Sequence, residues 1–329
     1  MEFSELGRLA GGHVEARIIQ AAVQLSVFDT LSENPSSWRS VAATLQLEPR
    51  ATELLLNALT ALELLEKTGE LFSLTPVAAK YLVRGSPHYL GAMILFDASL
   101  WNCWEQLADS VRSGKPPRAA DMYQDDPDET KVFIAGMDSL VKARGDGGVL
   151  ARSIDWAKVS KLLDVGSGPG TYPIHLCREF RGLSATIFDL PGTLQITQRY
   201  VREAKMEARI RLVPGNYRTD PIPGTYDVVF LSNIIHGEDD EENRRLMAKL
   251  FSNLEPGGRV IVKDHILDET RANPPVGAIF SLLMLLTTAG GRCYSFNEIK
   301  TWMERAGFSR IQQIDLPHPL TSSLVIGTK

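Results

Sequence analysis

The residues best suited to acid–base chemistry are His236 and Asp264, each at the end of a stretch that predicts a buried strand. His236 lies just beyond Tyr226–Leu231, and Asp264 closes Arg259–Asp264. Because the carboxyl ends of parallel strands meet at the sheet edge where ligands bind, we expect these side chains within reach of each other. A carboxylate on one imidazole nitrogen fixes the tautomer and steadies the imidazolium, so the pair predicts a general base. The alternative for Asp264 is a strand-end cap, or an ion pair with Lys263 or an arginine.

A glycine-rich turn follows another apolar strand and opens a helix. Gly166–Gly170 has the spacing Gly-x-Gly-x-Gly, which suits a sharp turn and the close approach of a ligand to the backbone. The dinucleotide fingerprint needs Gly-x-Gly-x-x-Gly, and its last position here is Thr171. The spacing therefore argues against NAD, whose pyrophosphate must lie at the helix N-terminus.

Polar residues also follow the next two predicted strands. Asp189, before Pro191, is placed to accept hydrogen bonds from both ribose hydroxyls of an adenosine; the alternative is a turn aspartate before proline. Asn216 and Tyr217 are placed to contact an adenine edge and face, with a plain loop as the alternative. These positions predict an adenosyl ligand at the same sheet edge as His236.

The elements that position these side chains alternate between strand and helix after Ala151, which predicts a parallel sheet. Asp239 or Asp240 is expected to cap the helix after the fourth strand. The last two strands are candidates for an antiparallel edge hairpin. The strands are predicted at Lys161–Val165, Ser184–Phe188, Ile210–Val213, Tyr226–Leu231, Arg259–Asp264, Ser309–Ile314 and Leu324–Gly327.

The first hundred residues are predicted to be mostly helical. A short helix at Val41–Leu45, a turn at Leu47–Pro49, a longer helix and a hairpin ending in Leu71–Leu74 follow the order of a winged helix. The longer helix is expected to bury Leu54, Leu55, Ala58, Leu59, Leu62 and Leu65. The segment from Val41 to Arg84 contains four Lys or Arg and five Glu, whereas a DNA-binding module needs a surface with excess positive charge. This half therefore predicts a packing or dimerisation role and no nucleic-acid partner.

Composition sets further bounds. The 329 residues carry a net charge of -5 and are 44% hydrophobic, as in an ordinary globular protein. No apolar run approaches the roughly 18 residues of a membrane span, and the start lacks the features of a secretory signal. Three widely spaced cysteines predict neither a disulfide framework nor a zinc site. We expect a cytoplasmic protein without membrane or metal.

Together these motifs resemble the plant caffeate and isoflavone type O-methyltransferases and their bacterial relatives, including acetylserotonin- and hydroxyneurosporene-methyltransferase-like proteins. The resemblance rests on Leu162–Gly170, Phe188–Pro191, His236 with Asp239–Glu241, and Leu254–Arg259, in family order. It implies a Rossmann-like domain with a mostly parallel seven-stranded sheet that binds S-adenosylmethionine (SAM) and releases S-adenosylhomocysteine (SAH). It also implies an N-terminal winged-helix-like domain (1–100) that mediates a homodimer, and a helical linker with the catalytic domain at 101–329 (core 150–329).

The resemblance implies a role for each site residue. His236 matches the catalytic base and Asp264 the carboxylate that steadies it. The implied cofactor contacts are Asp164, Gly166, Ser167, Gly168, Gly170, Asp189, Leu190, Asn216, Tyr217 and Ser232. The implied acceptor-lining residues, each of which has helix packing as its alternative, are Phe133, Met137, Met284 and Thr288.

Three positions depart from the family pattern. Members usually have an acidic residue where Asn216 stands, and many have lysine in place of Ser232. Plant members carry a second glutamate that orients the histidine where this chain has Cys293. A cysteine is no equivalent charged partner at neutral pH unless its pKa is strongly lowered. His236 is therefore expected to have one carboxylate partner.

The chemistry predicted is methyl transfer from SAM to a hydroxyl of an aromatic or polyketide-like small molecule. A phenol has a pKa of about 10, so a base near neutrality is needed to free its oxygen. The enzymatic alternatives are a C- or N-methyltransferase, a divergent SAM-binding enzyme, or an NAD oxidoreductase. An alternative from another class is a winged-helix regulator that responds to SAM.

Overall fold

The computed structural model describes residues 2–329, which divide into two compact units. One unit holds the chain up to Trp101 together with Ala135–Ala143; the other holds Asn102–Ile134 and Arg144–Lys329. Helix α9 (Pro127–Arg144) contributes residues to both.

The first unit is built from helices and a small antiparallel sheet of order β1-β3-β2. Ser37 and Thr75 cap the helices that follow them with their hydroxyl oxygens, and Glu48 does so with its carboxylate. The core is apolar, with Phe28, Leu56 and Phe72 almost fully buried. The elements are α1 (Phe3–Gln24), α2 (Val27–Thr30), β1 (Ser36–Ser37), α3 (Trp38–Leu45), α4 (Pro49–Ala61), β2 (Leu65–Thr68), β3 (Leu71–Leu74), α5 (Pro76–Tyr81) and α6 (Gly91–Ser99).

The winged-helix order of α3, α4 and the β2–β3 hairpin is present, but the longer helix differs from its prediction. It begins at Pro49, directly after its cap Glu48, as the predicted turn implies, but it ends at Ala61, before Leu62 and Leu65. Glu63 then takes a left-handed φ of 57°, which turns the chain so that Leu65 begins β2 instead of extending the helix. Leu54, expected on the buried side, is exposed.

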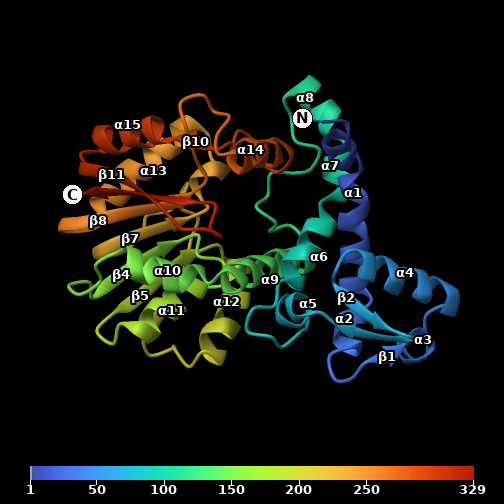
Figure 1. Cartoon of the computed structure of the whole chain (residues 1–329). Helices are drawn as coiled ribbons and strands as arrows, with labels where there is room; N and C mark the ends of the chain where they lie inside the picture. Colours follow the sequence, from blue (N-terminus) through green and yellow to red (C-terminus); the bar gives the residue numbers. More distant parts are fainter. Residues whose placement is uncertain (1) are drawn as a thin grey trace. The chain divides into compact units, whose positions relative to one another are not determined.

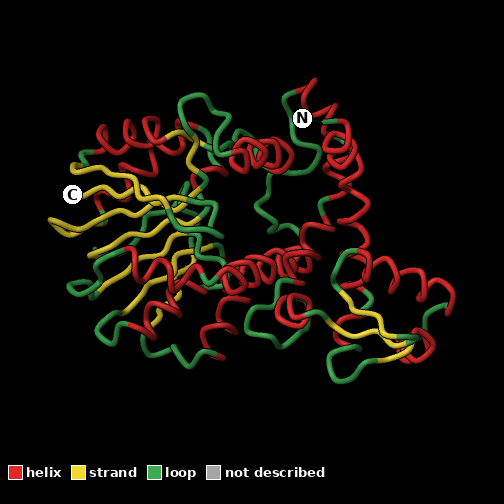
Figure 2. The backbone as a smooth tube through the Cα atoms, in the orientation of Figure 1, coloured by secondary structure: helices red, strands yellow, loops and turns green. Residues whose placement is uncertain are grey.

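The second unit contains a seven-stranded sheet of order β11-β12-β8-β7-β4-β5-β6 (Figures 1 and 2). All neighbours pair in parallel except β12, which pairs antiparallel with both β8 and β11, so the predicted edge hairpin is confirmed. The strands are β4 (Lys161–Val165), β5 (Ser184–Asp189), β6 (Ile210–Pro214), β7 (Tyr226–Ser232), β8 (Leu254–Asp264), β11 (Ser309–Asp315) and β12 (Ser323–Thr328).

Only the start of β8 departs clearly from the predicted strands. The turn-like Pro256-Gly257-Gly258 suggests a start at Arg259, but the strand already begins at Leu254. Leu254 pairs with Tyr226, and the register shifts before Val228 pairs with Arg259. An irregularity in the pairing thus accommodates the glycines without ending the strand.

Helices cover both faces of the sheet, as a parallel sheet requires. In Figure 1, α13 and α15 lie on one face, and α11 and α12, with α10 packed on α11, lie on the other. The remaining elements are α7 (Trp101–Glu105), α8 (Leu107–Ser113), α10 (Asp146–Ser153), α11 (Thr171–Glu179), α12 (Pro191–Glu203), η1 (Ile235–Gly237), α13 (Asp240–Ser252), β9 (Ile266–Leu267), α14 (Pro275–Thr287), β10 (Tyr294–Ser295) and α15 (Phe296–Ala306).

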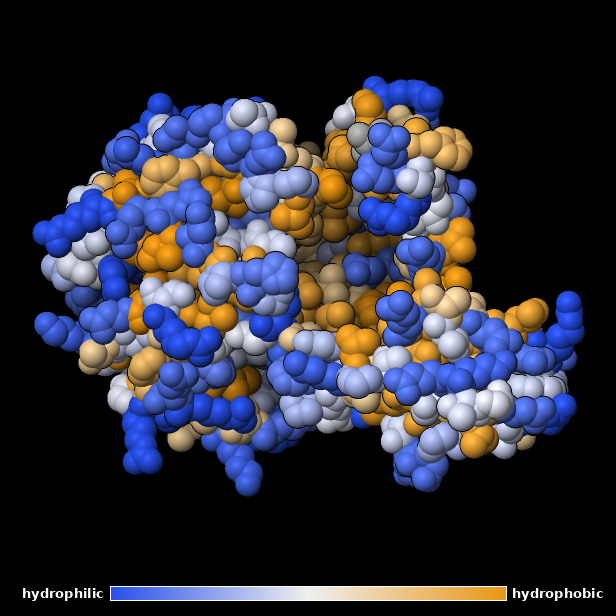
Figure 3. Space-filling model, in the orientation of Figure 1, coloured by the Kyte–Doolittle hydropathy of each residue, from blue (hydrophilic) through white to orange (hydrophobic). Residues whose placement is uncertain are grey.

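The surface and the core divide by polarity. Val228–Leu231 in the central strand β7 are almost fully buried, which explains their unbroken apolar run. On the face seen in Figure 3, hydrophilic side chains of this unit surround smaller apolar patches. Within residues 2–329, no helix combines the length and the apolar character needed to cross a membrane.

Candidate active site

The carboxyl ends of four neighbouring strands carry most of the polar residues singled out in the sequence. Asp164 lies near the end of β4, Asp189 ends β5, Ser232 ends β7 and Asp264 ends β8. Parallel pairing of β5, β4, β7 and β8 brings these ends to one edge of the sheet.

The glycine turn after β4 has a backbone that other residues rarely adopt. Gly166, Gly168 and Gly170 all have positive φ, of 66°, 60° and 77°. At Gly166 a Cβ atom would lie 2.4 Å from Ile234 Cδ1, so a side chain there would collide with the loop after β7. The turn is therefore tight, and at Gly166 in particular the neighbouring loop leaves no room for a side chain.

Asp189 holds this turn in place. Its Oδ2 accepts a hydrogen bond from the Gly168 amide (2.8 Å) and its Oδ1 accepts one from the Leu190 amide (2.7 Å). Burial raises the pKa of Asp189 to about 6, although the two backbone bonds act to lower it. No cationic side chain among residues 2–329 forms an ion pair with it.

Asp164 lies behind the same turn and is less well satisfied. Its Oδ2 accepts a hydrogen bond from the Ser167 hydroxyl (2.6 Å), whereas its buried Oδ1 has no partner in the described chain. Burial, and to a lesser degree the nearby Asp189 charge, raise the pKa of Asp164 to about 8. SAM carries an ammonium group and a sulfonium, so its charge and its donors suit this pair of buried carboxylates.

The loop after β6 places Asn216 and Tyr217 differently from each other. The Asn216 side chain accepts a hydrogen bond from the Arg218 amide (2.9 Å) and so shapes a turn. Tyr217 is buried, and its ring approaches within 4.0 Å of the position a Cβ of Gly166 would take. The ring of Tyr217 therefore lies beside the glycine turn, while the Asn216 amide oxygen is used within its own loop.

His236 and Asp264 meet as expected. The Nδ1 of His236, in η1, lies 2.7 Å from Asp264 Oδ1, and both residues are buried. Burial opposes ionisation of Asp264, but the imidazole beside it lowers the pKa of the carboxyl below its ordinary value. An ionised carboxylate only accepts, so Nδ1 carries the proton and Nε2 keeps its lone pair.

Both alternatives for Asp264 can also be judged. Its Oδ1 accepts a hydrogen bond from the His265 amide (2.8 Å), so it caps the strand as well as contacting His236. It makes no ion pair with Lys263, whose Nζ lies 3.2 Å from Asp146 instead. Ser232 pairs in register with Lys263 on the neighbouring strand.

Helix α14 supplies an apolar wall beside His236. The Phe280 ring packs edge-on against the His236 imidazole, with 4.8 Å between centroids, and also lies near His265. Met284 is buried on the same helix. The Thr288 hydroxyl donates to the Met284 carbonyl and accepts from the Gly291 amide, so it closes the end of α14.

The other two predicted acceptor residues lie on α9. Phe133 stacks on Tyr123, with ring centroids 4.6 Å apart, within the second unit. Met137 belongs to the first unit. The sequence does not predict that Tyr123 contacts Phe133, because a tyrosine in a polar loop has no pattern that indicates its partner.

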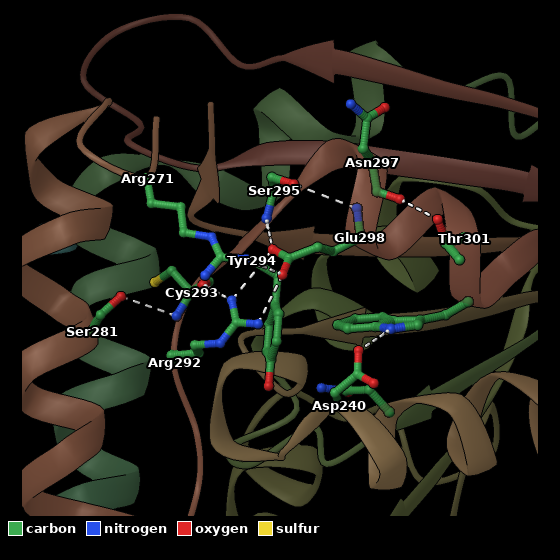
Figure 4. A network of polar contacts seen from close by, with 12 residues as sticks. Asp240, Arg271, Ser281, Arg292, Cys293, Tyr294, Ser295, Asn297, Glu298 and Thr301 are labelled. Carbon is green, nitrogen blue, oxygen red and sulfur yellow. Dashed lines mark hydrogen bonds and ion pairs between the residues drawn. The ribbon is translucent and has the colours of Figure 1, made fainter. Parts of the chain in front are cut away.

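Cys293 is a neutral group in this environment. Burial, with a further contribution from the Asp264 charge, raises the pKa of its thiol to about 12. The Cys293 amide donates to the Ser281 hydroxyl at 3.1 Å (Figure 4). The thiol does not supply the charge of the glutamate found in plant members, and Asp264 is the carboxylate that contacts His236.

Comparison with known proteins identifies the family. Residues 104–309 match the model of the O-methyltransferase domain, and residues 8–84 match that of the O-methyltransferase dimerisation domain. The chain belongs to the O-methyltransferase family. The resemblance inferred from the motifs is thereby confirmed, and this O-methyltransferase uses SAM, as its glycine turn and Asp189 indicated.

Similar proteins cover the whole chain. This O-methyltransferase is 31% identical over 98% of its length to 3-hydroxy-5-methyl-1-naphthoate 3-O-methyltransferase of Streptomyces sahachiroi, of which 94% is covered. It is 32% identical to the tetracenomycin polyketide synthesis 8-O-methyl transferase TcmO of Streptomyces glaucescens, over 95% of this chain and 93% of that protein. The solved structure of PigF with SAH matches it with a TM-score of 0.90 and 25% identity over 100% of both chains. These matches leave the NAD oxidoreductase alternative without support.

Proposed function

We propose that this enzyme transfers the methyl group of SAM to a hydroxyl of an aromatic or polyketide-like small molecule, with His236 as general base. The observation that carries the proposal is the bond between His236 Nδ1 and Asp264, which leaves Nε2 with a lone pair at the sheet edge that bears the glycine turn. The names of the two Streptomyces relatives, a naphthoate 3-O- and a polyketide 8-O-methyltransferase, support the choice of oxygen and of acceptor class.

The cofactor is assigned to the β4 and β5 ends of the edge. When bound, SAM supplies a methyl group on a sulfonium sulfur. Asp189 and Leu190 hold the ribose, and Asp164 with Gly166–Gly170 holds the methionine portion. Tyr217 borders the adenosyl moiety, with smaller contributions from Asn216 and Ser232.

The proton is handled at the β7 and β8 ends. His236 Nε2 accepts the hydroxyl proton, and the resulting imidazolium is steadied by Asp264, which stays ionised at neutral pH because its pKa is lowered. Phe280 and the apolar face of α14 keep water away from the imidazole. Phe133, Met137, Met284 and Thr288 are proposed to line the acceptor.

We also propose that the chain acts as a homodimer through residues 1–100, with residues 101–329 forming the catalytic part. The dimerisation-domain match and the exposed apolar residues Phe3, Leu6 and Leu9 of α1 support this. Light scattering of the full chain and of a Phe3→Glu/Leu6→Glu variant tests it; a wild-type monomer contradicts it.

The decisive experiment begins with calorimetric titration of SAM, SAH and NAD, followed by methyl transfer assays with hydroxynaphthoates and other phenols. We expect both adenosyl ligands to bind and NAD not to bind, and the methyl group to be found on oxygen. Products methylated at nitrogen or carbon would instead favour the C- or N-methyltransferase alternatives.

A further inference from the structure

Glu238, two residues after His236, is a buried carboxylate that the proposed chemistry does not use. Its side chain is 3% exposed. It accepts a hydrogen bond from the Tyr217 hydroxyl (2.5 Å), and the Arg218 Nε lies 2.9 Å from both of its oxygens. Both donors belong to the loop after β6. Glu238 therefore joins the loop that carries His236 to the loop proposed to border the cofactor.

The sheet itself does not connect these two loops. In the strand order β7-β4-β5-β6, two strands separate β7 from β6. Both loops nevertheless meet at Gly166, where a Cβ atom would lie 2.4 Å from Ile234 of one loop and 4.0 Å from Tyr217 of the other. The hydrogen bonds from Tyr217 and Arg218 to the Glu238 carboxylate therefore link the two loops beside the glycine turn.

The backbone of Glu238 is anchored on its other side. Its carbonyl oxygen accepts a hydrogen bond from the Tyr294 hydroxyl (2.5 Å). The Asn243 amide nitrogen donates to the Ile235 carbonyl at 2.9 Å and lies 3.4 Å from the Glu238 carbonyl. The segment that contains His236 is thus held at both ends of its single turn of 3-10 helix.

Tyr294 lies among side chains that contact its ring and one another (Figure 4). The Arg292 guanidinium lies 4.1 Å from the centroid of the Tyr294 ring, and Trp302 packs edge-on against that ring at 4.7 Å. Arg292 is itself held by the Glu298 carboxylate at 2.8 Å, and the Trp302 indole donates to Asp240 at 2.7 Å. The ring that carries the hydroxyl contacting Glu238 is therefore packed on both sides.

The charge of Glu238 strengthens its contacts with the loop after β6. A buried carboxylate without a partner is costly, and the Arg218 guanidinium lies 2.8 Å from it. Burial and the Glu238 charge also keep the pKa of Tyr217 well above its ordinary value, so the phenol remains a donor. Neither loop can move away without leaving this carboxylate unpaired.

We propose that Glu238 is a positioning residue that couples SAM binding to the placement of His236 by tying the loop after β6 to the loop after β7. The proposal deepens the proposed function and rests on its assignment of the cofactor to the glycine turn. By linkage, a cofactor that orders one loop orders the other, and loosening the His236 loop weakens cofactor binding.

The test uses the full-length protein and SAH, and needs no acceptor. Glu238→Gln keeps the shape of the side chain and removes its charge. We expect this variant to bind SAH about 10-fold more weakly by calorimetry, since a hydrogen bond to a buried charge is lost. Tyr294→Phe, remote from the loop after β6, should weaken SAH binding about threefold, and the double variant should be no weaker than Glu238→Gln alone.

Hydrogen exchange distinguishes a positioning residue from a merely structural one, because replacing a structural residue would not remove the effect of SAH on the His236 loop. SAH should slow amide exchange in residues 233–240 of the wild-type protein, and this slowing should be absent in Glu238→Gln. Asp227→Asn is the matched control: Asp227 accepts bonds from the Ser160 hydroxyl and from the Ser160 and Lys161 amides at the opposite end of the sheet. It should lower Tm but keep SAH affinity within twofold and retain the slowing.

Two results would overturn the coupling: SAH affinity of Glu238→Gln within twofold of wild type, or SAH protection of residues 233–240 unchanged in that variant. Full turnover by His236→Ala would instead refute the proposed base and leave both SAH measurements as they are. Failure of the coupling and failure of the proposed function are therefore distinguishable.

Discussion

The buried carboxyl groups at the carboxyl ends of the strands differ in the direction of their pKa shifts. At the β4 and β5 ends, burial raises the pKa of Asp164 to about 8 and that of Asp189 to about 6, and neither forms an ion pair within the described chain. At the β8 end, Asp264 is equally buried but its pKa is lowered, because His236 Nδ1 lies 2.7 Å away. The proposed catalytic pair is complete within the chain, whereas the proposed cofactor end holds two buried carboxyl groups that have no ion-pair partner in the described chain. We propose that the cationic groups of SAM supply that partner.

The largest effect is expected at the His236–Asp264 pair. His236→Ala removes the proposed base and should lower the turnover of a phenolic acceptor about 10³-fold. SAH affinity should stay within twofold, because the cofactor end is untouched. Steady-state kinetics and calorimetry check both parts.

His265→Ala is the control for that experiment. His265 also lies near Phe280, but its Nδ1 is 2.9 Å from the Thr321 carbonyl and not from a carboxylate. We expect less than about a 10-fold loss of turnover from this variant. Equal losses of turnover from the two histidine variants would show that pairing with Asp264 does not identify His236 as the base.

The second prediction concerns the cofactor end. Asp189→Ala removes the proposed ribose ligand and the acceptor that fixes the Gly168 amide, so SAH should bind about 100-fold more weakly, equivalent to roughly 3 kcal/mol. Calorimetric titration measures this. Unchanged affinity would remove Asp189 from the site and weaken the contrast between the two ends.

The third prediction follows the sign of the Asp164 pKa shift. A folded-state pKa of about 8, raised from an ordinary value of 3.8, contributes stability that is fully present below 3.8 and is lost as the pH rises through 8. The free energy of unfolding of the ligand-free protein should therefore fall by about 2 kcal/mol more in wild type than in Asp164→Asn between pH 5 and 7. Denaturant unfolding at both pH values measures the difference. Parallel pH profiles would contradict it.

The smallest effect is a proton released on binding. In the ligand-free protein Asp164 is mostly protonated at pH 7, and the positive charge of SAM should ionise it, with release of up to about one proton per SAM bound. Calorimetry in buffers of different ionisation enthalpy measures the release, which should disappear in Asp164→Asn. Release that persists in that variant would place its source elsewhere.

Much of this arrangement is predictable from the sequence because it depends on neighbours along the chain. Apolar runs place all seven strands of the main sheet, with only the start of β8 misplaced, and Asp239 caps α13 as its position before an acidic turn predicts. The glycine spacing likewise indicates a tight turn. Local sterics and hydrogen bonding decide these features.

The partners of individual charges are not predictable in this way. Lys263 precedes Asp264, yet it pairs with Asp146, because successive side chains of a strand point to opposite faces of the sheet. Glu238 reads as part of an acidic run at a helix start, and only folding brings it to Tyr217 and Arg218.

The order of strands and helices, the glycine turn and the kinds of side chain at the carboxyl ends of the strands all follow from the sequence alone. Which of those side chains pair with one another depends on the tertiary fold. Each carboxylate pairs with the groups that the packing of distant segments brings within hydrogen-bond distance. Asp264 thereby contacts His236, whereas the buried Oδ1 of Asp164 has no partner in the described chain, and burial makes the effect of this difference on their pKa values large.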